Sequence, residues 1–228
     1  MQETSERSSI NWLRKIICED EGLQALDQYA QENLSADPGH DYAHALRVAL
    51  CALQIGQDAV ESRSAIAAAL LHDIVNPPKN SPLRTQASEL SAQKARELLP
   101  QYGFEAPQIE DIAIAIRDHS YSRGATPTSM LGQTLQDADR LEALGAVGIM
   151  RCVATGVQMG GQLFHSSDPW AQDRELDEKQ FAIDHFFTKL FKLPNTMQTE
   201  KGQTEARRRV EVMEQFLNAL GHELGYSR

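Results

Sequence analysis

The sequence has few cysteines, and none of them is spaced as a pair. Cys18, Cys51 and Cys152 are the three cysteines in a chain of 228 residues, and no CxxC spacing occurs. Disulfide-stapled domains and thiolate zinc sites both need clustered or regularly spaced cysteines. The pattern argues against both classes. It favours a reducing compartment, so we expect a cytoplasmic protein.

Long hydrophobic runs are also missing. No stretch approaches the roughly 20 apolar residues that a membrane span requires. The N-terminal sequence MQETSERSSI is polar and contains no hydrophobic region of the kind found in signal peptides. We therefore expect neither a signal peptide nor a membrane partner.

Positive charge is in deficit, because 22 Lys and Arg residues face 32 Asp and Glu residues and give a formal net charge of -10. A surface of this charge repels the phosphate backbone of nucleic acid, so binding to duplex nucleic acid is not expected. A small anionic substrate is compatible with this charge. A metal ion and a few local cations can outweigh the average field inside a cleft.

Strand patterns are scarce, whereas apolar residues at helical spacing recur along the chain. We predict an all-α fold, a compact helical bundle that forms a single domain over residues 1–228, because no linker is evident. The Gly-, Ser- and Asp-rich stretch 156–173 is predicted to be a long surface loop, either a functional lid or a mobile connection. The predicted helices cover residues 8–18, 20–34, 40–57, 63–75, 84–100, 107–121, 128–144, 177–192 and 202–221.

Ionisable residues occupy apolar faces of three predicted helices. His44 shares a face with Val48 and Cys51, and His119 ends a series of isoleucines in the sixth helix. Asp139 follows Leu135 by four residues, so its carboxylate points where the leucine points. A single histidine on such a face is often a hydrogen-bonded core residue, but a buried carboxylate without a partner costs several kcal/mol.

The dipeptide His72-Asp73 ends the most apolar predicted helix, just before the break Asn76-Pro77. A carboxylate at a helix C-terminus faces the negative end of the helix dipole, which is unfavourable unless a cation lies nearby. Two Asp and two His that converge on one core indicate either a salt-bridged network or a metal site. These donor types suit a divalent transition metal or magnesium.

The order His44, then His72-Asp73 within LLHDIV, then Asp139 within QDADRLEALG resembles the H…HD…D signature of HD-domain phosphohydrolases. The resemblance covers about residues 35–155 well and the C-terminal helical extension, about 177–221, more loosely. It is closest to a bacterial branch that includes nucleoside triphosphate pyrophosphohydrolases. The resemblance implies that His44, His72, Asp73 and Asp139 bind one divalent metal ion, with Mn, Mg, Fe, Ni, Co and Zn all compatible and a second metal ion not ruled out.

Departures from the signature narrow the activity. Guanosine tetraphosphate hydrolases typically carry an acidic pair shortly after the HD dipeptide, where this chain has Ile74-Val75-Asn76-Pro77. The cyclic dinucleotide branch carries a Gly-Tyr-Pro signature, and the Gly-Tyr of this chain, Gly225-Tyr226, is followed by Ser. Both activities are therefore disfavoured. Asn76 also stands where some HD hydrolases place a water-orienting acid, and an amide cannot act as a general base.

The resemblance implies a metal-dependent phosphohydrolase acting on a small phosphorylated substrate. The leading hypothesis is a nucleotide, with the triphosphate cut to monophosphate and pyrophosphate by attack of a water molecule that the metal activates. One alternative is a phosphomonoesterase acting on nucleoside monophosphates or other small phosphoesters. Another is a non-catalytic sensor that binds metal or nucleotide, which Asn76 keeps open. A homodimer is compatible with each of these.

Catalytic roles are assigned to three residues. Asp73 or Asp41 could accept a proton from the attacking water, and His119 could donate one to the leaving oxygen or bind a phosphate. His119 could instead bind a second metal or pack in the core. His40 and Asp41 precede His44 by four and three residues and could orient it through a hydrogen bond or cap the helix.

The remaining predicted residues support the metal or the substrate. Asn76 and Asp137 are predicted to lie next to the metal ligands, with a surface position as the alternative for Asp137. Cations near the site would neutralise a polyanion's charge. The candidate substrate-binding residues are Arg47, Lys79, Arg84, His185 and Lys189. For Arg47 the alternative is an exposed position on a solvated helix, and for His185 and Lys189 it is a purely structural one.

Overall fold

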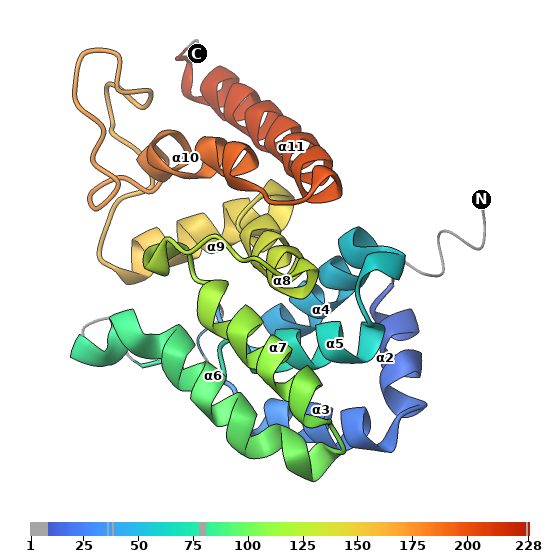
Figure 1. The fold of residues 1–228 in the computed structure, drawn as a ribbon. Coiled ribbons are helices and arrows are strands. Elements are labelled where there is room, and N and C mark those ends of the chain that lie inside the picture. Colours follow the sequence, from blue (N-terminus) through green and yellow to red (C-terminus); the bar gives the residue numbers. More distant parts are fainter. Residues whose placement is uncertain (1–8, 36, 38, 78–80, 227) are drawn as a thin grey trace. The chain divides into compact units, whose positions relative to one another are not determined.

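The computed structural model describes residues 9–35, 37, 39–77, 81–226 and 228. Helices dominate this part of the chain, and the prediction of an all-α fold is confirmed (Figure 1). Within the described residues the β-structure is limited to one isolated bridge between Gln162 and Phe181. None of the helices in the described ranges combines the length and hydrophobicity that a membrane crossing needs.

The chain divides into two compact units, Met1–Asp139 and Arg140–Arg228. The division falls inside α8, Met130–Glu142. The single-domain organisation stays a prediction. All of the predicted metal ligands lie in the first unit, so the scaffold of that unit positions the candidate site.

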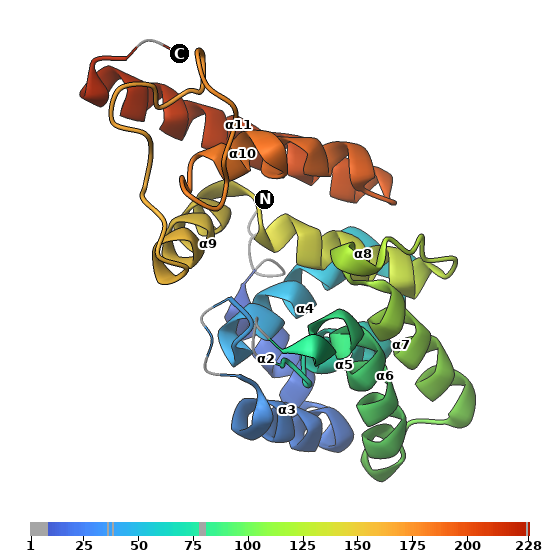
Figure 2. The ribbon, with the colours of Figure 1, turned by 90° about the vertical axis from the view of Figure 1, so that its left-hand side faces the viewer.

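The first unit is built around α5, which is buried from Ser64 to Leu71. Its sequence SRSAIAAALL has almost no polar side chain after the first turn, and a helix that is apolar all round belongs in the interior. In both ribbon views α5 lies among its neighbours α3, α4, α6 and α7 (Figures 1 and 2). The helices of this unit before α8 are α2 Ile10–Cys18, α3 Glu21–Asn33, α4 Tyr42–Gly56, α5 Ser62–Leu71, α6 Ala87–Leu98 and α7 Ala106–Asp118.

Side-chain caps determine where several of these helices begin. Ser9 accepts from the Trp12 amide at the start of α2, and Asp20 accepts from the Leu23 amide at the start of α3. A capping box of Glu105 and Gln108 opens α7. Each cap satisfies backbone donors that the first turn of a helix leaves unpaired. Short 3-10 turns fill the connections: η1 Gln57–Ala59, η2 Pro82–Gln86, η3 Leu99–Tyr102 and η4 Tyr121–Arg123.

The second unit contains α9 Gly145–Gln158, α10 Asp184–Thr188, η5 Leu190–Thr196 and α11 Glu200–Leu224. The long helix α11, drawn in red, packs against α9 and η5 (Figure 1). Thr199 caps its start by accepting from the Gly202 amide, and Gly225, with φ of 74°, ends it in the left-handed conformation that favours glycine.

Two helix predictions for this unit are wrong. The sequence analysis missed α9, and it predicted a helix over 177–192 where α10 covers Asp184–Thr188. The cause at α10 is Asp184, whose fully buried carboxylate accepts from the Asp177 amide at 2.7 Å and from both terminal nitrogens of Arg174. These bonds tie Arg174 and Asp177 to Asp184, and the residues between Asp177 and Asp184 form turns and the isolated bridge at Phe181 instead of the predicted helix.

We predict that Asp184→Ala lowers the free energy of unfolding by about 3–5 kcal/mol, because it leaves the Arg174 charge without its partner. Urea unfolding followed by the fluorescence of Trp170, in a Trp12→Phe background, measures the change in this unit. Trp170 donates to the Tyr226 carbonyl at 3.2 Å. The matched control is Glu175→Ala, an exposed neighbour, which should change stability by less than about 0.5 kcal/mol. Equal stability of the two variants would contradict the structural role of the pair.

Candidate metal centre

His44 reaches the candidate site from the first turn of α4. The N-cap residue Asp41 accepts a hydrogen bond from the His44 amide, with 2.7 Å between Oδ1 and N. The His44 side chain is fully buried. Of the two readings for Asp41, the helix cap is therefore present in the structure, and its catalytic role stays a prediction.

His72 and His119 are both the C-cap residues of their helices, α5 and α7. The Nδ1 of His72 lies 2.6 Å from the carbonyl of Ala69, and the Nδ1 of His119 lies 2.6 Å from that of Ile116. A carbonyl only accepts, so each Nδ1 carries the proton. In the neutral form of either ring, which is the form that binds metal, the Nε2 then carries the lone pair. A hydrogen bond of this kind fixes the tautomer and orientation that a metal-binding histidine needs.

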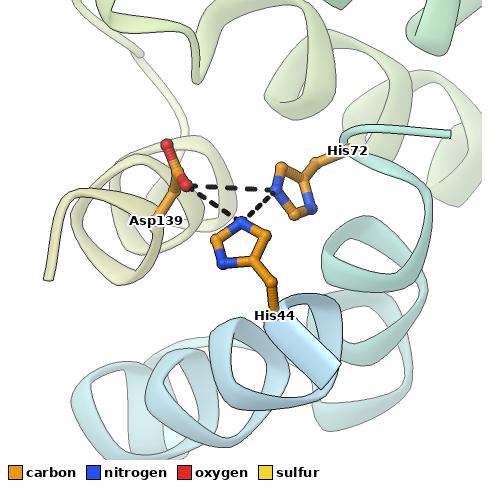
Figure 3. Close-up of side chains that lie close together, drawn as sticks. All are labelled: His44, His72 and Asp139. Atoms are coloured by element: carbon orange, nitrogen blue, oxygen red, sulfur yellow. Dashed lines mark hydrogen bonds and ion pairs between the residues drawn. The ribbon is translucent and has the colours of Figure 1, made fainter. Parts of the chain in front are cut away.

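The side chains of His44, His72 and Asp139 converge from three helices, as Figure 3 shows. The Nε2 atoms of His44 and His72 are 3.2 Å apart. The Oδ1 of Asp139, from α8, lies 3.4 Å from the His44 Nε2 and 4.0 Å from the His72 Nε2. One ligand atom from each residue lies within 4.8 Å of the others, so the three could hold one metal ion.

A second group of the same kind shares His72. The Oδ2 of Asp73 lies 3.3 Å from the His72 Nε2, and its Oδ1 lies 3.9 Å from the His119 Nε2. His72, Asp73 and His119 also place one ligand atom each within 4.8 Å of one another. The structure therefore brings the four predicted ligands and His119 into one continuous cluster.

The pKa values of the cluster show how strongly its charges interact. Burial disfavours the charged form of His72, but the carboxylates of Asp73 and Asp139 outweigh it and raise the pKa of His72 to about 9. Burial also opposes ionisation of Asp73, yet the imidazole of His72 holds the pKa of that carboxyl well below its usual range. The pKa of Asp139 is likewise lowered, against burial, by the hydrogen bond with His44. Both carboxylates are ionised at neutral pH and require positive charge beside them.

The donor set fits a divalent cation. Imidazole nitrogens and carboxylate oxygens together suit first-row transition metals, and carboxylates suit magnesium. The C-terminal ends of α5 and α7 also meet at the cluster, and their dipoles favour a cation there. Burial and the neighbouring His72 lower the pKa of His119, so this ring is neutral and its Nε2 is available as a ligand or an acceptor.

Three other predicted residues lie on or just before the helices that carry the ligands: His40 before α4, Arg47 on α4 and Asp137 on α8. The Nδ1 of His40 pairs with Asp37 at 3.1 Å, and its ring meets the His44 ring edge-on at 6.1 Å between centroids. Asp137 is fully buried, so its alternative position on the surface is excluded. Arg47 is partly buried on α4, one turn after His44.

The loop after His72-Asp73 is held by Arg84, which lies in η2. The Nη1 of Arg84 donates to the side-chain oxygen of Asn76 and, at 3.2 Å, to the carbonyl of Pro77. Arg84 is thus fixed next to the HD dipeptide, and its contact with substrate stays a prediction. Lys79 lies outside the described residues.

Two predicted substrate-binding residues belong to the second unit. The Nδ1 of His185 lies 2.8 Å from the Glu178 carboxylate. Lys189 follows one turn later, and both side chains line a cavity of that unit. The structure thus brings these two together with each other, and their contact with substrate stays a prediction.

The sequence analysis missed Gln136, which is fully buried on α8 one turn before Asp139. Its amide nitrogen donates to the carbonyls of Asp118 and Ala125, both at 3.0 Å. One side chain therefore clamps both ends of the segment that contains His119. The available signal was limited to a polar residue directly after Leu135 in a helix with buried leucines, and the partner carbonyls are invisible in a sequence.

Comparison with known proteins gives consistent matches. Residues 41–144 match the HD domain family. The chain is 32% identical over 187 residues to the uncharacterized protein YpgQ of Bacillus subtilis (strain 168), a match that covers 80% of this chain and 83% of YpgQ.

Solved structures agree with these matches. The crystal structure of B. subtilis YpgQ in complex with ADP matches with a TM-score of 0.70 and 29% identity, over 88% of this chain and 93% of that one. An HD-superfamily hydrolase from Bacillus thuringiensis matches with a TM-score of 0.68 and 28% identity, over 89% of this chain and 96% of that one. The predicted membership of the HD-domain superfamily is confirmed.

We predict that Mn²⁺ affinity rises by up to about tenfold per pH unit between pH 6.5 and 8.5. With a pKa of about 9, the metal-free His72 carries a proton throughout this range, and the metal must displace it. The raised pKa means that this proton is lost only as the pH passes about 9, so competition weakens as pH increases. Calorimetric titrations in two buffers of different ionisation enthalpy measure both the affinity and the proton release. A pH-independent affinity without proton release would contradict the placement of His72 among the ligands.

Proposed function

The chain belongs to the HD-domain superfamily, and from the geometry of its cluster we propose that it is a metal-dependent phosphohydrolase that acts on a nucleotide. The observation that carries the proposal is the convergence of His44, His72 and Asp139 with the Nε2 lone pair of His72 fixed by a backbone carbonyl. This arrangement is suited to holding a cation and poorly suited to a core without one. HD-superfamily hydrolases of similar structure support the reaction class.

The ligands in the proposal are His44, His72, Asp73 and Asp139. A divalent ion held there supplies a Lewis acid for a phosphoryl oxygen and lowers the pKa of water. Asp73 approaches two histidines, with Oδ2 near His72 and Oδ1 near His119. Of the two predicted proton acceptors, Asp73 is the one that lies among the ligands, whereas the Oδ1 of Asp41 accepts from the His44 amide as a helix cap.

His119 acts as an acceptor or a ligand in this proposal. Its Nδ1 proton is committed to the Ile116 carbonyl, and its Nε2 faces Asp73 with a lone pair. The ring could donate to a leaving oxygen only after taking up a second proton, which its lowered pKa opposes. Of the three predicted roles, donation to the leaving group is thus the least supported by the geometry.

Arg84 is the best-supported phosphate-binding residue of the first unit. Its contacts with Asn76 and Pro77 engage Nη1. The planar guanidinium has further donors at Nε and Nη2, which match the geometry of phosphate oxygens. Asn76 thereby gains a positioning role in place of the acid that some related enzymes carry at this position.

We assign the substrate as a nucleoside triphosphate that is cut to monophosphate and pyrophosphate. The nucleotide class is supported by the ADP complex of YpgQ, and the cleavage position rests on the resemblance of the motifs. The net charge of -10 favours a small substrate over a nucleic acid.

Incubation of the protein with Mn²⁺ and a nucleotide panel tests this assignment, with products separated by ion exchange. We expect pyrophosphate without orthophosphate. We also expect His72→Ala and Asp139→Asn to lower turnover by roughly a hundredfold or more, because each removes a ligand. His222→Ala, an exposed histidine of α11, is the matched control and should leave turnover unchanged.

Two outcomes would overturn the proposal. Release of orthophosphate alone would identify a phosphomonoesterase. Tight nucleotide binding without metal-dependent turnover would identify a binding protein. If His72→Ala keeps the metal content of the wild type, the ligand assignment itself is wrong.

A further inference from the structure

A cavity of about 360 Å³ lies within the second unit, between α9 and the segment that leads through α10. Arg151 lines it from α9, and Glu178, Lys179, His185 and Lys189 line it from the opposite segment. Three permanent cations thus face one carboxylate. Such an excess is informative in a chain whose net charge is -10, where an average patch of surface is acidic.

The single carboxylate of the lining is engaged by its own neighbours. The Oε2 of Glu178 accepts from the Nδ1 of His185 at 2.8 Å and from the hydroxyl of Thr188. These hydrogen bonds, from Thr188 foremost, keep the pKa of Glu178 below its usual value. Glu178 therefore fixes the His185 ring at the cavity and cancels only part of the positive charge around it.

Part of the cavity lining is apolar and uncharged. Cys152 belongs to this part, and its thiol donates to the Ala182 carbonyl at 3.3 Å. Burial raises the pKa of this thiol to about 12, and the nearby Glu178 adds to the shift, so Cys152 contributes no thiolate charge. Leu190 and Met159 extend the apolar lining. Mostly apolar walls with a few converging polar groups are typical of small-molecule sites.

We propose that this cavity binds the phosphate group of a small phosphorylated compound, with the apolar part of the lining against the body of the ligand. A phosphate monoester carries a charge of about -1.5 to -2 at neutral pH. Together with Glu178 it neutralises the three cations more fully than Glu178 does alone. The guanidinium of Arg151 suits two phosphate oxygens at once, and the lysines serve as point charges. None of the metal ligands lines the cavity.

Isothermal titration of the full-length chain with inorganic pyrophosphate in EDTA tests the proposal without any contribution from a bound metal. We expect saturable binding that Arg151→Gln and Lys179→Glu each weaken by about tenfold or more. Lys179 is exposed, so its substitution leaves the fold intact. Arg207→Gln, an exposed arginine of α11 outside the cavity, is the matched control and should bind as the wild type does. Absence of binding, or equal binding by all three variants, would overturn the proposal.

Steady-state kinetics of the Mn²⁺-loaded protein separate two sources of the phosphate. If it belongs to the nucleotide of the proposed reaction, Arg151→Gln raises KM with little change in kcat, and pyrophosphate competes with substrate. If it belongs to a separate ligand, Arg151→Gln leaves both constants unchanged and abolishes any effect of pyrophosphate. Both results support the site. Absence of turnover would contradict the proposed function, but the titration in EDTA would still test whether the cavity binds phosphate.

Discussion

Two ionised carboxylates within a buried set of imidazole nitrogens can coexist only if positive charge lies between them. Asp73 and Asp139 each approach the Nε2 of His72, and the geometry leaves a proton or a metal ion as the source of that charge. A proton satisfies one ring at a time, whereas a divalent ion satisfies every donor of the cluster at once. The candidate function of the chain depends on this electrostatic requirement more than on any other feature.

The scaffold of the first unit serves the same requirement. The apolar helix α5 is buried on all sides, so it delivers His72 and Asp73 into the interior at its end. The chain beyond them is then fastened, because the Ser91 hydroxyl bonds the Val75 amide at 3.1 Å and Arg84 binds the Asn76 side chain. A ligand pair at the end of a firmly packed helix keeps its position without the metal, so less conformational entropy is lost when the metal binds.

Helical periodicity alone predicted that His44 and Asp139 point into the first unit from apolar helix faces, and in the structure their side chains meet there. The same reasoning missed α9, since Gly148 and Gly156 weaken its helical propensity. In the structure a Cβ at Gly148 would lie 2.2 Å from the Ala143 carbonyl oxygen, and one at Gly156 would lie 2.7 Å from the Ala182 Cβ. Close packing selects these glycines. Contacts between distant residues, such as Arg174 with Asp184, likewise leave no local pattern in a sequence.

The two C-cap histidines share a property that extends beyond binding. Each takes its orientation from a carbonyl three residues earlier in its own helix, one of those that a helix end leaves unpaired. A single helical turn therefore determines the orientation of the ring. Residues of the surrounding surface can change and give a new specificity while the imidazole keeps its orientation. The condition is that the helix still ends at the same residue.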